Sequence, residues 1–177
     1  MFDFCISQHT AVRANDFSDV TNLTSNDSAV KSGQVLRLTQ GSHHVSGSAW
    51  FNTEQPVPAG FTSIFKFQIS HSANAASGPA EGIAFVIQNS GPTARGGAGG
   101  AIGYGVPDAG DEANGSQAIT KSLAVEFDTF QNGRDPDANH IAVQSCSPNA
   151  NLQKHPTCQL GIFSLDPSDD LLDRQES

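Results

Sequence analysis

The sequence predicts an all-β protein, an antiparallel β-sandwich, on three observations: short apolar runs, frequent turn residues and the absence of helical periodicity. Glycine occurs 17 times and proline 9 times among the 177 residues, a composition that favours many turns over long helices. No segment of ten or more residues repeats its apolar side chains every 3.6 positions, as an amphipathic helix would. A chain of this length suits one domain.

Six short segments have the pattern of β-strands. Apolar side chains alternate along residues 35–39 and 61–69, and the second alternation places four side chains on one face. They are Phe61, Phe65, Phe67 and Ile69. Residues 82–87 form a continuous apolar run, as expected for a strand that is buried on both faces. Strands are also expected at residues 47–51, 122–128 and 140–143. The long segments at residues 70–80, 89–105 and 106–121 are expected to be functional loops.

The charge of the chain limits its partners. Eighteen acidic residues against nine basic ones give a net charge of −9, which repels phosphate backbones and anionic membranes, so nucleic acid is not an expected partner. No apolar run reaches the length of about 18 residues that a membrane helix needs, so membrane insertion is not expected either. The first residues show no secretory signal. We expect residues 1–165 to form the domain and residues 166–177 to form an acidic, polar tail.

Three cysteines are present: Cys5, Cys146 and Cys158. The last two flank a segment rich in proline and asparagine that has the composition of a loop. A disulfide between them would stabilise the fold by about 3 kcal/mol in the chain-entropy model. Two free thiols are the alternative, and the sequence leaves both open.

The residues with the clearest chemical potential follow residue 125. Glu126 and Asp128 share one face of the expected strand, about 6.6 Å apart, so their like charges require neutralisation. Further donors follow at Asn132, Asp135, Asp137 and His140. Oxygen donors suit Ca²⁺, whereas carboxylates mixed with imidazole suit a transition metal such as Mn²⁺. The pattern therefore favours a two-metal site over a solvated acidic hairpin.

Two other motifs were considered for the same residues. An EF-hand loop that begins at Asp128 requires an acid or amide at its third position and glutamate at its twelfth, where this chain has Phe130 and Asn139. A glycoside hydrolase requires two catalytic carboxylates, and laminarinase-type enzymes of jelly-roll fold carry a second glutamate after the Glu-x-Asp pair. That glutamate is missing here, so an enzyme is not expected.

The stretch LAVEFDTFQNGRDPDANHI, residues 123–141, resembles the metal-binding stretch of the legume (L-type) lectins, including bacterial members. Supporting similarities occur in the family's order at residues 47–51, 61–67, 81–86 and 99–103, and the resemblance covers roughly residues 17–143. It implies a concanavalin-like jelly roll that binds carbohydrate outside the cell without turning it over. Because family members continue through several more strands, the sandwich is expected to be incomplete at its C-terminal end.

The resemblance also implies residue roles. Glu126 and His140 are similar to the transition-metal ligands, and Asp128 and Asp135 resemble the acids that touch both ions. The side chain of Asn132 and the main-chain carbonyl of Phe130 resemble calcium ligands. The carbohydrate contacts implied are Glu81, where the family has aspartate, Gly100, Phe130 through its ring, and Asn132.

Other features were given no functional role. Asp137 is expected to be solvated, and His9, His71 and His155 are expected to carry no function. Homo-oligomerisation is left open, and a structural or adhesive module without sugar specificity is the remaining alternative.

Overall fold

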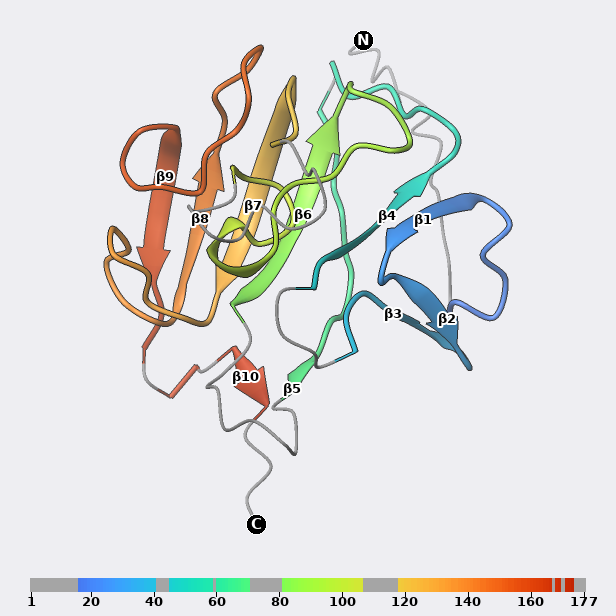
Figure 1. Cartoon of the computed structure of the whole chain (residues 1–177), viewed down its shortest axis with the longest axis horizontal. Helices are drawn as coiled ribbons and strands as arrows, with labels where there is room; N and C mark the ends of the chain where they lie inside the picture. The colour runs from blue at the N-terminus through green and yellow to red at the C-terminus, as the bar shows by residue number, and fades with distance from the viewer. Residues whose placement is uncertain are drawn as a thin grey trace, which may run out of the picture.

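The computed structural model describes residues 16–40, 45–58, 60–70, 81–106, 118–166, 168–169 and 171–173. Within these ranges the regular structure consists of ten β-strands and one 3₁₀ turn, η1 (Gly99–Ala101) (Figure 1). The prediction of an all-β fold with antiparallel sheets is therefore confirmed. No described segment forms a helix with the length and apolarity needed to span a bilayer.

The principal sheet contains four antiparallel strands. They lie in the order β6 (Gly82–Gln88), β7 (Ser122–Asp128), β8 (His140–Gln144) and β9 (Gln159–Ser164). The predicted strands at residues 82–87, 122–128 and 140–143 correspond to β6, β7 and β8. The sequence analysis did not identify β9, which forms the edge of the sheet beside β8 (Figure 1).

Three two-stranded pairs complete the described structure. β1 (Leu23–Asp27) pairs in antiparallel fashion with β4 (Gly47–Phe51), and β2 (Val30–Ser32) pairs likewise with β3 (Val35–Arg37). β5 (Ile69–Ser70) pairs in parallel with β10 (Leu172–Asp173). The strand β10 lies within the segment that the sequence analysis expected to be a tail.

The prediction of a strand over residues 61–69 is wrong for all but its last residue, because residues 61–68 belong to no strand. The alternation nevertheless corresponds to side-chain packing of Phe65 and Phe67 against the principal sheet. The Phe65 ring stacks on Phe85 with centroids 5.4 Å apart, and the Phe67 ring lies 4.8 Å from Phe127. A period of two indicates which side chains face a core; it does not indicate whether the backbone has a partner strand.

The opposite face of the principal sheet carries polar side chains. In β7 the buried positions are Ser122, Ala124, Glu126 and Asp128, while the alternate residues are half-buried. Loops cover this face, including the one that contains η1 (Figure 1). The largest fully buried side chains of the described residues all bear polar atoms: Tyr104, His140, Gln144, Glu126 and Asn151.

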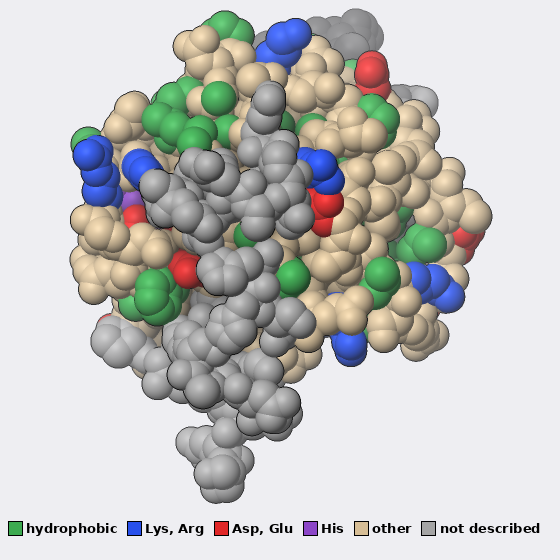
Figure 2. Space-filling model, in the orientation of Figure 1, with side chains coloured by type: hydrophobic (Ala, Val, Ile, Leu, Met, Phe, Trp, Pro, Cys, Tyr) green, Lys and Arg blue, Asp and Glu red, His purple; other side chains and the backbone are tan. Residues whose placement is uncertain are grey.

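On the face of the molecule shown in Figure 2, basic and acidic side chains are dispersed over the described surface and do not gather into one charged patch.

Candidate metal centre

Two neighbouring strands bring three potential metal ligands together. Asp128 and His140 are direct partners in the β7–β8 ladder, and Glu126 lies two residues away from Asp128 on the same face. All three are at most 3% exposed. His140 Nε2 lies 3.8 Å from Glu126 Oε1 and 3.9 Å from Asp128 Oδ2. Strand alternation therefore directs both carboxylates and the imidazole into one buried space.

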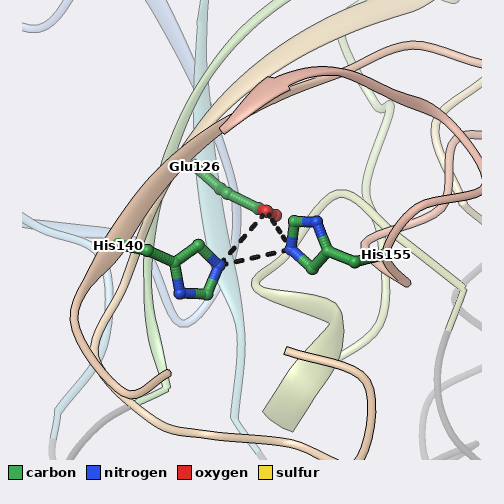
Figure 3. A group of neighbouring side chains, drawn as sticks. All are labelled: Glu126, His140 and His155. Carbon is green, nitrogen blue, oxygen red and sulfur yellow. Dashed lines mark hydrogen bonds and ion pairs between the residues drawn. The ribbon is translucent and has the colours of Figure 1, made fainter. Parts of the chain in front are cut away.

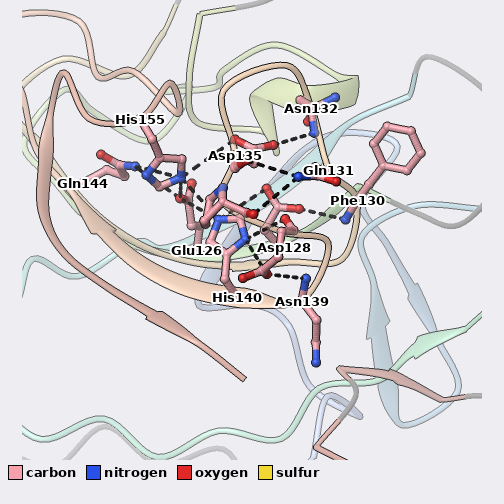
Figure 4. Close-up of polar contacts among 12 residues, drawn as sticks. Glu126, Asp128, Phe130, Gln131, Asn132, Asp135, Asn139, His140, Gln144 and His155 are labelled. Atoms are coloured by element: carbon pink, nitrogen blue, oxygen red, sulfur yellow. Dashed lines mark hydrogen bonds and ion pairs between the residues drawn. The ribbon is translucent and has the colours of Figure 1, made fainter. Parts of the chain in front are cut away.

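A tight turn after β7 returns Asp135 to the same space (Figure 4). The Asn132 N–H donates to Asp135 Oδ2 at 2.6 Å, and the Asp135 N–H donates to the Asn132 carbonyl at 3.2 Å. Asp128, Asp135 and His140 each offer one ligand atom, and these atoms all lie within 4.8 Å of one another. Four of the predicted metal ligands therefore converge: Glu126, Asp128, Asp135 and His140.

His155, to which the sequence analysis assigned no role, completes the group. It is 6% exposed, and its Nε2 lies 3.1 Å from Glu126 Oε1 and 3.9 Å from Asp135 Oδ1. The same nitrogen lies 3.2 Å from His140 Nε2 (Figure 3). No spacing rule could have identified it, because His155 reaches the site on a separate loop.

That loop connects β8 to β9 and is held at both ends. Cys146 and Cys158 form a disulfide, which settles the alternative left open by the sequence, and the Ser145 N–H donates to the Cys158 carbonyl at 2.8 Å. Inside the loop, the Asn151 amide donates to the Gln144 carbonyl at 3.1 Å. These contacts hold the loop against the polar face of the sheet.

Glu126 is oriented by two further side chains that the sequence analysis missed. The Tyr104 hydroxyl donates to Glu126 Oε2, and Gln144 Nε2 donates to Glu126 Oε1 at 3.2 Å. Burial, followed by the charge of Glu126, raises the pKa of the Tyr104 phenol well above its usual value. Tyr104 therefore keeps its proton at neutral pH and can donate it to Glu126.

The site concentrates negative charge in a poorly solvated space. Burial, together with the Asp135, Glu126 and Glu81 carboxylates, raises the pKa of Asp128 to about 8, against a hydrogen bond from the Phe130 N–H that lowers it. Burial also raises the pKa of Asp135. A hydrogen bond to Glu126 raises the pKa of His155 despite its burial. Buried carboxylates beside imidazole nitrogens fit a divalent cation.

A small hollow lies next to these donors. It has a volume of about 260 Å³, and Gly100, Asn132, Asp135 and Gln153 are among the residues that line it. A Cβ atom built on Gly100 would lie 2.8 Å from Asn132 Oδ1, so the glycine and the amide are in close contact. The structure thus brings together Gly100 and Asn132, two of the predicted carbohydrate contacts.

The other two predicted contacts lie at the end of β7. Gly82 pairs with Asp128, and the Thr129 N–H donates to the Glu81 carbonyl at 3.1 Å, so Glu81 sits beside the site. The Phe130 N–H donates to Asp128 Oδ1 at 2.8 Å, while the Phe130 ring points away from the carboxylates (Figure 4).

Comparison with known proteins identifies the family. The model of the legume lectin domain matches residues 10–167. The chain belongs to the legume lectin domain family. A lectin alpha chain from Lablab purpureus is 34% identical over 144 residues, which cover 72% of this chain and 47% of that protein. The chain thus spans about half the length of this curated relative.

Membership in the legume lectin domain family confirms the resemblance found in residues 123–141. Legume lectins in general bind metal ions, and this domain contains two overlapping groups of candidate ligands. One group comprises Asp128, Asp135 and His140, and the other comprises Glu126, His140 and His155.

Proposed function

We propose that this legume lectin domain binds carbohydrate without chemical turnover, in a pocket that a calcium ion and a transition-metal ion hold in shape. The family match and the name of the relative, a lectin, support binding as the activity. The missing second glutamate argues against glycoside hydrolysis.

One observation carries the proposal, namely that Asn132 links the buried donors to the hollow. Its main-chain N–H donates to Asp135, a member of the donor cluster, while its side chain lies against Gly100, which lines the hollow. An ion bound by Asp135 would therefore fix the position of the Asn132 amide. Preorganised donors and acceptors improve affinity because less ordering is left for the binding step.

The two ions would use overlapping ligands. We propose that Glu126 and His140 hold the transition metal, with Mn²⁺ as the ion that the family resemblance implies, and that Asp128 and Asp135 contact both ions. The Phe130 carbonyl and the Asn132 side chain would complete a calcium site of oxygen donors. The ions supply charge neutralisation and rigidity to the turn at residues 129–135.

The carbohydrate would be bound at the rim by few groups. Glu81 and Asn132 offer hydrogen bonds to hydroxyl groups, Gly100 offers its main-chain N–H, and the Phe130 ring offers an apolar surface on the side away from the acids. Such a site has weak affinity for one sugar, so homo-oligomerisation would increase avidity. An extracellular or secreted location agrees with the family and with the disulfide.

The proposal is tested by glycan-array binding of the protein, with and without a chelator. We expect glycan binding that chelation abolishes and that Ca²⁺ with a transition metal restores. Asn132→Ala should lose this binding, and Asn149→Ala, an exposed asparagine in the loop after β8, is the matched control. Metal binding without any glycan would contradict the proposal and favour a structural or adhesive module. Glycan binding that persists in both Asn132→Ala and chelator would contradict the role of the site.

A further inference from the structure

We propose that His155 is a direct ligand of the transition metal, so that the site contains two imidazoles and binds Zn²⁺ in preference to Mn²⁺. This inference rests on the proposed function, which has a calcium site and a transition-metal site, and it concerns only the transition-metal site.

The backbone of Asp137 fixes the tautomer of His140. Its Nδ1 lies 3.2 Å from the main-chain carbonyl oxygen of Asp137. A carbonyl oxygen only accepts hydrogen bonds, so Nδ1 carries the proton, and the lone pair of the neutral ring resides on Nε2. Ligating histidines are commonly oriented in this way, by donating their second N–H to a backbone carbonyl or a carboxylate. Asp137, expected to be merely solvated, therefore orients His140 through its backbone.

His155 has the same arrangement through a different partner. Its Nδ1 lies 2.7 Å from the side-chain oxygen of Gln159 at the start of β9, which again places the proton on Nδ1. The Gln144 amide nitrogen lies 3.3 Å from the same Nδ1, but it donates to Glu126 Oε1 at 3.2 Å. When the ring is neutral, the lone pair on His155 Nε2 therefore faces the buried space as well.

Two imidazole lone pairs and one carboxylate now face one another. The two Nε2 atoms lie 3.2 Å apart, and Glu126 Oε1 lies 3.1 Å from His155 Nε2 and 3.8 Å from His140 Nε2 (Figure 3). These tautomers leave no proton between the two Nε2 atoms, so the arrangement is repulsive without a shared cation. Two ligand nitrogens bound tetrahedrally to Zn²⁺ at 2.0–2.1 Å would lie about 3.3 Å apart. The observed separation therefore fits a metal ion between them.

The second imidazole strengthens the preference of the site for Zn²⁺ over Mn²⁺. Carboxylates suit Mn²⁺, whereas imidazole suits Zn²⁺, and Zn²⁺ already exceeds Mn²⁺ in the general order of affinities for nitrogen and oxygen ligands. A nitrogen ligand in place of a water molecule widens that difference. The competing arrangement is a protonated His155 that neutralises Glu126 in place of a metal.

The first test uses the unaltered protein loaded with Co²⁺, a paramagnetic substitute for Zn²⁺. Each ligating imidazole retains its Nδ1–H and should give one strongly shifted, exchangeable proton resonance. Two such resonances are expected, from His140 and His155. A single resonance would overturn the inference, and this readout does not depend on the folding of a variant.

The second test measures Zn²⁺ and Mn²⁺ affinities by competition with a chromophoric chelator. His155→Ala should weaken Zn²⁺ binding by at least about 100-fold, the upper end of the loss seen when a ligand's outer partner is removed, and should weaken Mn²⁺ binding less. Thr157→Ala, an exposed change in the same loop, should leave both affinities unchanged. Unchanged Zn²⁺ binding in His155→Ala would overturn the inference. Tighter Zn²⁺ binding would overturn it too, because it would show that a protonated His155 competes with the metal for Glu126.

These outcomes are separable from those of the glycan experiment. Metal-dependent sugar binding by a protein with one shifted resonance would overturn this inference alone. Two shifted resonances in a protein that binds no glycan would overturn the proposed function alone.

Discussion

The hydroxyl of Tyr104 donates a hydrogen bond to Glu126 Oε2, and both side chains are completely buried. Tyr104 follows η1 in the same loop as Gly100, so this hydrogen bond joins the loop at the rim of the hollow to the centre of the donor cluster. The other carboxylate oxygen, Glu126 Oε1, accepts a hydrogen bond from the side chain of Gln144 in β8.

Replacement of Tyr104 by phenylalanine should therefore weaken metal binding while the fold is retained. The ring is kept, but Glu126 Oε2 loses its donor, and loss of such a partner commonly lowers metal affinity about 10–100-fold. Chelator competition measures the affinity, and circular dichroism checks the fold. An affinity equal to that of the parent protein would show that Tyr104 has no orienting role.

Replacement of Asp128 by asparagine should change stability in opposite directions with and without metal. Without metal, the variant should melt at a higher temperature, because it removes a carboxyl whose pKa is raised to about 8 in the folded state. The asparagine oxygen can still accept the Phe130 N–H. With excess Ca²⁺ and transition metal, the variant should melt at a lower temperature than the parent, because it binds the ions poorly. Equal melting curves in both conditions would count against a metal at Asp128.

The metal-free protein should become less stable as the pH rises from 5 to 8. The pKa values of Asp128 and Asp135 are raised above the unfolded value of 3.8, and that of His155 is raised above 6.5. The folded state therefore binds more protons than the unfolded state, and the free energy of unfolding falls as these groups lose their protons. The lowered pKa values of the exposed Asp16, Asp19 and Asp166 act below about pH 4 and do not oppose this trend.

Urea denaturation in chelator at several pH values measures that trend. The metal-loaded protein should behave in the opposite way, because metal competes with protons for the same ligands. A metal-free protein that is more stable at pH 8 than at pH 5 would contradict the assigned pKa directions.

A methyl group on Gly100 should abolish sugar binding and weaken calcium binding, but it should not affect transition-metal binding. The backbone of Gly100 accommodates alanine, but the new Cβ would lie 2.8 Å from Asn132 Oδ1 and 3.1 Å from Nδ2, so the amide must move. Gly133→Ala is the control, since a Cβ there meets no atom within 4 Å. Metal content and glycan binding are measured on the same samples, and full glycan binding by Gly100→Ala would exclude this contact.

The double substitution Cys146→Ser and Cys158→Ser should lower the free energy of unfolding by about 3 kcal/mol, as expected for a loop of this length. Because the loop carries His155, the affinity for the transition metal should fall as well. Denaturation in chelator separates the two effects, since it reports the loss of the crosslink alone. A double variant as stable as the parent would show that the loop is held by its hydrogen bonds.

The parts of this structure that follow local rules could be predicted from the sequence. Alternation along residues 122–128 placed Glu126 and Asp128 on one face, and the donors that follow in the chain converge on them. The rule failed at residues 61–68, because side-chain packing against Phe85 and Phe127 produces the same period as a strand ladder.

Contacts that depend on the return path of a loop could not be predicted. Tyr104 and His155 reach Glu126 from two separate loops on the same face of the sheet, and no spacing within the chain encodes either approach. In the sequence, only the pair Cys146 and Cys158 indicated that His155 could lie near the site. Their disulfide closes the loop between β8 and β9 and so restricts where that histidine can lie.

Among the described residues, the largest fully buried side chains are also those of the donor cluster and its supports. In the proposed function, the buried groups that would bind the ions are therefore also part of the packed interior, beside the apolar residues Ile102, Ile119 and Ala124. Under that proposal, a new sugar preference is expected from changes at less buried positions such as Glu81 and Phe130. A change among the deeper groups is expected to alter metal affinity and stability together.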